Sequence, residues 1–346
     1  MVAGAITLGL VVSACGSKPT TSTATTSNFK ACMVTDTGGI DDRSFNASAW
    51  QGMQAAQKTG KAKVSFVQSK SESDYAPNIA QLVGQKCKLI VTVGGLMAQA
   101  TTDASKKDPS QHFAIVDSNG NGTNVQGLQF NTAQAGFLAG YLAAGYSKTG
   151  KVATYGGLKI PPVTIYMDGF WEGVQYYNAK KGKNVQVLGW SEKTQNGSFA
   201  GSFTDQSQGQ QLANNFIQQG ADVIFPVAGG TGLGSAGAAQ ASNGKAVIIW
   251  VDTDGVVSAP QYASVFLSTA FKNVNNAVQK AVQDASGGTF ATTDYVGTLN
   301  NGGVGLSPFH DFDSKVDPTL KSELNQIKSD IMSGTIKITS PAQPKG

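Results

Sequence analysis

The chain has 346 residues, of which 14% are charged and 40% hydrophobic, and its formal net charge is +4. This length is enough for two domains that each bury a core, and the composition excludes a disordered or collagen-like protein. The basic residues are scattered along the sequence, and the densest group, Lys180 to Lys183, is typical of a solvated helix end. We therefore expect no binding to nucleic acid.

The amino terminus has the features of a bacterial targeting segment. Met1 to Ala14 are small and apolar, and this run ends in the small-residue pattern that precedes a lipidated cysteine, here Cys15. The run is too short to span a bilayer, and no Lys or Arg precedes Lys18, so the usual positive segment is missing. A frayed apolar terminus is the alternative. Residues 16–28 are rich in Ser and Thr, and we expect a disordered tether there.

From Phe29 onward, short β-rich runs alternate with helical stretches, which predicts α/β lobes with mostly parallel, doubly wound sheets. We expect strands at 31–35, 64–68, 89–93, 113–116, 125–130, 151–157, 185–188, 222–227 and 247–251. We expect helices near 45–58, 74–86, 96–106, 132–147, 206–219 and 232–242. The sequence WQGMQ follows Gly38-Gly39, and WEGVQ follows Gly156-Gly157. This echo indicates two lobes of common design.

The pattern is less regular after Asp252. We expect a strand at 264–267, a helix at 272–285, a strand or hairpin at 295–306 and a final helix at 323–332. The expected amino-terminal lobe is 29–150 plus about 270–290, and the expected carboxy-terminal lobe is 151–269 plus about 291–335. Several crossovers between the lobes would form a hinge.

Sequence motifs of catalysis or metal binding are missing. His112 and His310 are the only histidines, and neither has neighbours that suggest a triad or a metal site. We expect no enzyme activity, no cofactor and no metal. One alternative stays open, because Gly232 to Gly237 has the spacing GxGxxG after a strand and before a helix, which would suit a dinucleotide.

Polar residues recur where expected strands end or helices begin. Asp36, Asp117 and Asp252 each follow an apolar run, and Lys272 opens an expected helix. Because ligands bind at the carboxyl edge of open α/β sheets, these side chains suit a shared binding site. Ionised carboxylates accept hydrogen bonds from hydroxyl and ring N–H groups, and a lysine offers three donors. Capping or hinge roles are the alternatives for each residue alone.

The stretch Thr35 to Gly52, TDTGGIDDRSFNASAWQG, joins an apolar strand to a helix through a cluster of capping-type residues. It resembles the signature of the BMP/PnrA-like basic membrane lipoproteins, and the resemblance continues in FAIVDS, GKVATYGG, GADVIFPVAGGTG, WVDTD and FKNV. That family consists of substrate-binding proteins of ABC importers, and its characterised members bind purine nucleosides. The resemblance implies a two-lobed periplasmic-binding-protein type I fold, a lipid anchor at Cys15, an ABC permease partner and a monomer without catalytic activity.

The resemblance also implies roles for residues of the first lobe. Asp36 would hydrogen-bond the base, Phe45 would stack on it, and Asn46 would lie beside them. Asp117 would add a polar contact.

On the second lobe, the family has an aromatic residue in a Gly-Ser-Phe segment, which occurs here twice, at Phe199 and Phe203. We favour Phe203, because the residues after it better match the family. Gly229 would approach the ligand by its backbone, and Asp252 and Lys272 would hold the ribose. A sugar ligand, or a surface adhesin or receptor without transport, is an alternative function.

Two further cysteines lie near the starts of expected strands, Cys32 in the first and Cys87 just before the third. With a strand order of 2-1-3, both would lie at the end of the sheet opposite the ligand. A disulfide and a pair of buried free thiols are both compatible with this placement.

Overall fold

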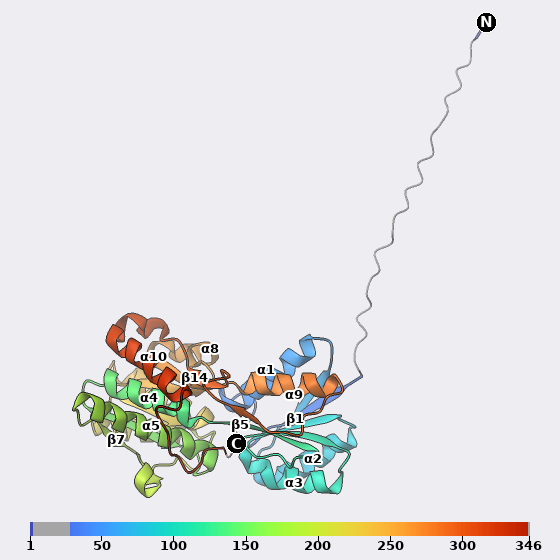
Figure 1. Cartoon of the computed structure of the whole chain (residues 1–346), viewed down its shortest axis with the longest axis horizontal. Coiled ribbons are helices and arrows are strands. Elements are labelled where there is room, and N and C mark those ends of the chain that lie inside the picture. Colours follow the sequence, from blue (N-terminus) through green and yellow to red (C-terminus); the bar gives the residue numbers. More distant parts are fainter. Residues whose placement is uncertain (3–27, 345–346) are drawn as a thin grey trace.

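Two sheets of six strands, each in its own α/β lobe, make up the frame of the molecule (Figure 1). The computed structural model describes residues 1–2 and 28–344. The expected lipidation site, Cys15, and most of the expected tether, 16–28, therefore lie outside the described residues.

The first sheet is parallel throughout and has the strand order β13-β5-β4-β3-β1-β2. Its strands are β1 (Lys30–Val34), β2 (Lys63–Val67), β3 (Leu89–Val93), β4 (His112–Val116), β5 (Val125–Phe130) and β13 (Tyr295–Gly297). The helices α1 (Phe45–Lys58) and α9 (Val274–Ser286) pack together on one face, and α2 (Tyr75–Gly84) and α3 (Ala98–Lys107) cover the other. Strand β3 is buried along its whole length, as its apolar sequence LIVTV predicts for a strand covered on both sides.

The second sheet has the strand order β14-β12-β11-β10-β6-β7, and only β14 is antiparallel to its neighbour. Its strands are β6 (Lys151–Gly156), β7 (Gln186–Leu188), β10 (Val223–Val227), β11 (Val247–Asp252), β12 (Phe266–Lys272) and β14 (Val304–Leu306). Its helices are α4 (Ala133–Tyr146), α5 (Pro161–Lys181), α6 (Gln206–Gln218), α7 (Gly232–Ala241), α8 (Gly255–Ser258) and α10 (Pro318–Met332). A small hairpin, β8 (Trp190–Ser191) with β9 (Asn196–Gly197), lies between β7 and α6 in the chain.

The Ala/Gly-rich helix α4 packs closely on α5 of the second lobe. A Cβ added at Gly140 would lie 2.0 Å from the Phe170 carbonyl oxygen, and one at Gly173 would lie 2.1 Å from that of Phe137. Glycine is therefore required for this helix contact. Within residues 1–2 and 28–344, no helix has both the length and the apolar character needed to cross a membrane.

The structure corrects the expected lobe boundaries at two points. Helix α4, expected in the first lobe within 29–150, packs in the second, and β13, expected in the second lobe within 291–335, pairs with β5 of the first sheet. Helix α4 lies in the second lobe because its glycines allow close packing on α5. Short strands near the end of the chain add to an edge of each sheet, so 295–306 forms β13 and β14 in different lobes instead of one hairpin.

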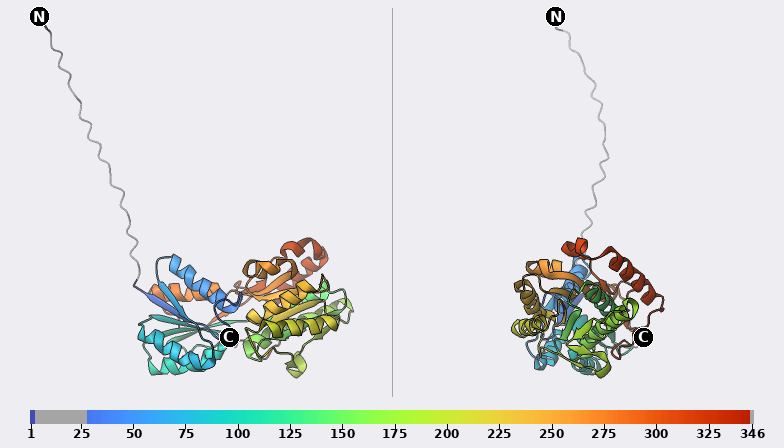
Figure 2. Two further views of the ribbon diagram at one scale, coloured as in Figure 1. Left: turned by 180° about the vertical axis from the view of Figure 1, so that it is seen from behind. Right: turned by 90° about the vertical axis from the view of Figure 1, so that its left-hand side faces the viewer.

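A third correction concerns Lys272, which ends strand β12 instead of opening a helix. The strand expected at 264–267 is β12, and it continues to Lys272, whereas helix α9 begins at Val274. In the described chain, three stretches cross between the lobes, namely β5 to α4, β12 to α9 and β13 to β14. They run side by side between the two sheets, which is the arrangement of a hinge (Figure 2).

Cys32 and Cys87 form a disulfide, which resolves the alternative that the sequence left open. Their Cα atoms are 5.9 Å apart, and both residues are buried. The order β2-β1-β3 brings them together, because β1 pairs directly with β3. The bridge lies toward the amino ends of these strands.

We predict that the Cys32→Ala/Cys87→Ala double variant is less stable than the wild type by about 2–4 kcal/mol, since the bridge spans 55 residues of chain and restricts the unfolded state. Denaturant unfolding of both proteins measures this difference. Wild-type protein kept in reductant serves as the control and should match the variant. An unchanged free energy of unfolding would contradict the prediction.

Candidate functional site

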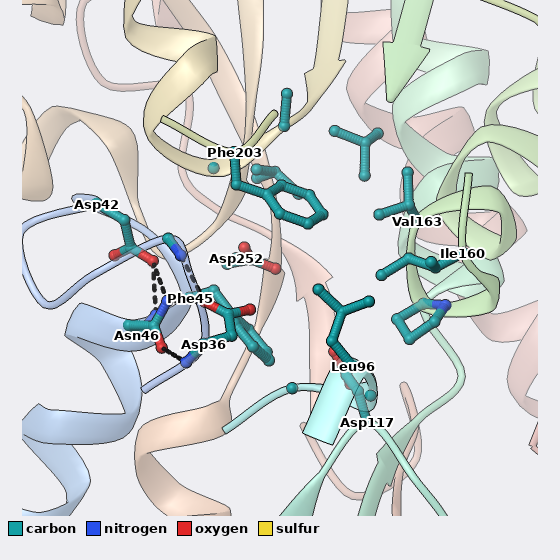
Figure 3. A pocket seen from close by; sticks show the side chains of 18 of the residues that line it. Asp36, Asp42, Phe45, Asn46, Leu96, Asp117, Ile160, Val163, Phe203 and Asp252 are labelled. Atoms are coloured by element: carbon teal, nitrogen blue, oxygen red, sulfur yellow. Dashed lines mark hydrogen bonds between the residues drawn. The ribbon is translucent and has the colours of Figure 1, made fainter. Parts of the chain in front are cut away.

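A cavity between the lobes lies at the carboxyl ends of the strands of both sheets. It has a volume of about 550 Å³, including the part that is open to solvent. All eight residues that the sequence analysis placed at a ligand site line it: Asp36, Phe45, Asn46, Asp117, Phe203, Gly229, Asp252 and Lys272. Figure 3 labels all of them except Gly229 and Lys272. Tertiary structure therefore brings residues from both lobes to one place.

Asp36 is the buried carboxylate at the end of β1. Its Oδ1 accepts hydrogen bonds from the Gly38 backbone N–H at 2.8 Å and from Asn46 Nδ2 at 2.7 Å. The Asp36 backbone N–H in turn donates to Asn46 Oδ1. Burial raises the pKa of Asp36 to about 6, although these two hydrogen bonds favour the charged form. The carboxyl group can thus change charge near neutral pH.

Asp42 holds the start of α1 in place. Its carboxylate accepts from the backbone N–H groups of Ser44 at 2.9 Å, Asn46 at 2.7 Å and Ala47 at 3.0 Å, and also from Asn46 Nδ2. These N–H groups have no partner within the helix, so Asp42 supplies the cap that the capping-type cluster in the sequence predicted. Burial raises the pKa of Asp42 to about 7. The positions of Phe45 and Asn46 therefore depend on Asp42.

Lys272 is a buried cation that joins the two lobes. Its Nζ lies 2.7 Å from Asp117 Oδ2, which belongs to the first lobe, and 3.7 Å from Asp252 Oδ1, which belongs to the second. Burial by itself lowers the pKa of Lys272, but the two carboxylates outweigh this effect and hold it above the ordinary value. The ammonium group also lies 4.4 Å from the centroid of the Phe45 ring.

Asp117 and Asp252 share a backbone conformation that is uncommon for side-chain-bearing residues. Their φ angles are +64° and +66°, and each follows or ends a strand, β4 and β11 respectively. Aspartate tolerates this left-handed region better than most residues, and such backbone strain is concentrated at functional sites. Each lobe thus presents a carboxylate to the cavity from an aspartate at the end of a strand with a left-handed backbone conformation.

Two phenylalanine rings reach the cavity from opposite lobes. Phe45 is the first residue of α1, and Phe203 lies in the loop before α6, where its carbonyl accepts from the Thr231 N–H. The other Gly-Ser-Phe residue, Phe199, pairs with Gly156 and packs edge-on against Trp190 at 5.9 Å. Phe203 is therefore the ring of this pair that lines the cavity.

A hydrogen bond fastens the first lobe directly to Asp252. Ser44, which precedes α1 and is fully buried, donates from Oγ to Asp252 Oδ2 at 2.6 Å. On the second lobe, the Tyr166 hydroxyl donates to Asp252 Oδ1 at 3.3 Å. Both carboxylate oxygens of Asp252 are thereby oriented, and its position depends on contact between the lobes.

Sequence reasoning missed the apolar wall of the cavity. It comes from the loop after β3, the start of α5 and the ends of β10 and β11, and it includes Leu96, Ile160, Pro162, Val163, Tyr166, Val227 and Val251. Apolar residues in such places are indistinguishable from core residues in one sequence. Their position near strand ends is the only signal that could have found them.

The GxGxxG segment serves helix packing. A Cβ added at Gly234 would lie 1.8 Å from the Gln206 carbonyl oxygen, so helix α7 packs directly against α6 at this glycine. This contact occupies the space in which a pyrophosphate would have to bind. The dinucleotide alternative therefore has no support in the structure. His112 stacks on Phe290, and His310 contacts Asp254, both outside the cavity. The described residues contain no cluster of His, Cys, Asp or Glu that could hold a metal.

A polar and aromatic cavity between two hinged α/β lobes defines a solute-binding protein of the periplasmic-binding-protein type. Residues 29–341 match the model of a family described as ABC transporter substrate-binding protein PnrA-like. The chain belongs to this family, and the resemblance inferred from its motifs is confirmed. A protein that serves an ABC transporter in this way has a small-molecule ligand and a permease partner.

Individual relatives agree with this assignment. The chain is 34% identical to the CD4+ T-cell-stimulating antigen of Listeria monocytogenes, over 98% of this chain and 96% of that protein. It is 31% identical to the ABC transporter nucleoside-binding protein BmpA of Lactococcus lactis, over 90% of each. A solute-binding protein of an Aeropyrum pernix ABC transporter has a similar structure, with a TM-score of 0.81, 26% identity and coverage of 90% of this chain and 94% of its own. Further relatives are named as lipoproteins.

Proposed function

We propose that this protein is a lipid-anchored, monomeric receptor that captures a purine nucleoside between its lobes and delivers it to an ABC permease. The observation that carries the proposal is the pair of rings, Phe45 and Phe203, that face one cavity from opposite lobes with buried carboxylates beside them. We infer that the lobes open to admit a flat heterocycle, and that it stacks between the two rings when the lobes come together again.

The base is held by stacking and selected by polar contacts. Stacking on an aromatic side chain contributes about 1–3 kcal/mol per ring as judged by truncation, and it favours any flat base. Asp36 accepts its two protein hydrogen bonds on Oδ1, so Oδ2 is the oxygen that would accept from a ring N–H or amino group. A base without a matching donor would leave this buried carboxylate unpaired, at a cost of about 1–3 kcal/mol.

The sugar is held by the charged group at the hinge. A ribose hydroxyl can donate to Asp252 and accept from the Lys272 ammonium, which already donates to Asp117. These side chains are buried and oriented by Ser44 and Tyr166. The site therefore favours a nucleoside over a free base.

Attachment to the cell membrane would use Cys15 at the end of the apolar amino-terminal run. Stable anchoring needs more than one acyl chain, which lipoprotein processing provides. The names of several relatives, which call them lipoproteins, support this part of the proposal.

We predict that calorimetry detects binding of at least one of adenosine, guanosine and inosine, and weaker binding of cytidine, of free adenine and of ribose. We expect at least tenfold weaker binding in each of the variants Phe45→Ala, Phe203→Ala and Asp252→Ala. Each substitution removes a contact that contributes about 1.4 kcal/mol or more to the free energy of binding. Phe199→Ala is the matched control and should keep wild-type affinity. Failure of every nucleoside to bind would refute the proposed ligand, and tight binding of ribose alone would identify a sugar receptor.

We also predict that nucleoside affinity falls as the pH falls through about 6, where Asp36 takes up a proton and becomes a weaker acceptor for a hydrogen bond from the base. Affinity should be full above about pH 7 and about tenfold weaker at pH 5. Titrations of wild type and Asp36→Asn at both values measure the effect. The variant should show a smaller change, which is the part that comes from protonation of Asp42 at the start of α1. A change as large in the variant as in the wild type would contradict the role assigned to Asp36.

A third prediction concerns the contact between Ser44 and Asp252. Ser44→Ala should speed nucleoside release about tenfold, because it removes a hydrogen bond to a charged group that exists only when the lobes are together. Ser48→Ala is the matched control, since Ser48 is buried on the same helix and accepts from the Asn275 N–H within the first lobe. Stopped-flow displacement measures the rate of nucleoside release from both variants. Equal release rates would contradict the idea that the Ser44 hydrogen bond holds the two lobes together.

A further inference from the structure

The first lobe carries a group of lysines at the edge of its sheet that faces away from the cavity. We call this group the basic edge, and its members are Lys30, Lys58, Lys61, Lys63, Lys86 and Lys88. All of these residues are exposed except Lys30, which is partly buried. They come from three separate stretches of the sequence, and the fold brings these stretches together.

Strand pairing places three of these lysines at adjacent strand starts. Lys30 and Lys63 are register partners at the beginnings of β1 and β2. The backbone N–H of Lys88, one residue before β3, donates to the Lys30 carbonyl at 2.7 Å. Because β2, β1 and β3 are parallel neighbours, their three amino ends form one continuous edge.

The remaining three lysines lie in the connections that lead into the same edge. Lys58 is the last residue of α1, Lys61 lies in the connection from α1 to β2, and Lys86 lies between α2 and β3. The carboxyl ends of α1 and α2 are here too, and their exposed carbonyl groups favour nearby cations.

No acidic residue balances these charges locally. Residues 28–35, 43–71 and 75–102, which supply the basic edge, contain neither Asp nor Glu. None of the six lysines takes part in a salt bridge among the described residues. The group is also made of lysine alone, whereas arginine is the residue of choice for nucleic-acid recognition.

The polypeptide enters the first lobe at this edge. The described chain resumes at residue 28, and β1 begins two residues later at the end of the lobe that points away from the second lobe (Figures 1 and 2). If Cys15 carries a lipid, the 13 residues from Gly16 to Asn28 can span at most about 45 Å even when fully extended. The basic edge is therefore the part of the described protein that the anchor would keep nearest to the membrane.

We propose that the basic edge is a membrane-contacting surface that binds the anionic headgroups of phospholipids. Each lysine that reaches an anionic lipid surface strengthens binding about fivefold, and the attraction acts only within a Debye length of about 10 Å. Contact at this edge orients the first lobe with its strand carboxyl ends, and hence the cavity, turned away from the lipid. The inference rests on the lipid anchor proposed above, but it goes beyond the proposed function because it does not depend on which ligand the cavity holds.

The test uses the full chain carrying Cys15→Ser, so that no lipid contributes to binding. Sedimentation with vesicles of phosphatidylcholine, with and without about 30% phosphatidylglycerol, at about 50 mM and about 200 mM salt measures affinity. The test variant is Lys61→Gln/Lys86→Gln/Lys88→Gln. The control variant, Lys183→Gln/Lys245→Gln/Lys328→Gln, makes the same change of net charge at exposed positions of the second lobe.

We expect the wild type to bind the anionic vesicles more tightly than the neutral ones, and to bind less tightly at the higher salt concentration. The test variant should lose about 100-fold in affinity, and the control variant should stay within about threefold of the wild type. Equal binding to both vesicle types, or an equal loss in the two variants, would overturn the inference. Nucleoside titration of the same proteins tests the proposed function separately, since neither set of lysines lines the cavity.

Discussion

The buried contact of Lys272 with Asp117 and Asp252 is the interaction on which the rest of the site depends. Lys272 is only 3% exposed, and a buried ammonium group is stable only when carboxylates surround it. Here the carboxylates come from different lobes. The charges therefore favour the arrangement in which the lobes are together. Ser44 adds a hydrogen bond across the same boundary, so binding and closure involve the same side chains.

Around this charged group, hydrogen bonds within the first lobe hold its ligand-facing side chains in position. Asp42 caps α1 and, with Asp36, fixes both hydrogen-bonding ends of the Asn46 amide. Phe45 begins the same helix, so its ring is positioned by the cap. A site held by such a network loses little conformational freedom when a ligand binds, which favours affinity.

The parallel sheets give the first lobe two ends of different chemistry. The carboxyl ends of its strands carry carboxylates and an aromatic ring at the cavity, and the amino ends carry the basic edge and the disulfide between Cys32 and Cys87. A parallel sheet separates these ends by the length of its strands. One lobe can thus present a cavity on one side and a cationic surface on the other.

The sequence by itself determined the alternation of strands and helices and the cap of α1, because these follow from local spacing. Its contiguous motifs also indicated the family, and the family resemblance implied the polar and aromatic residues of the cavity but not its apolar wall. Tertiary structure decided what depends on distant pairing. It placed α4 in the second lobe and β13 in the first, and it ended β12 at Lys272. It also joined the cysteines and gathered lysines from three stretches of sequence at one edge. A single sequence shows which segments form strands or helices. It does not show which segments pack together, because that depends on how strands distant in the sequence pair at the edges of a folded sheet.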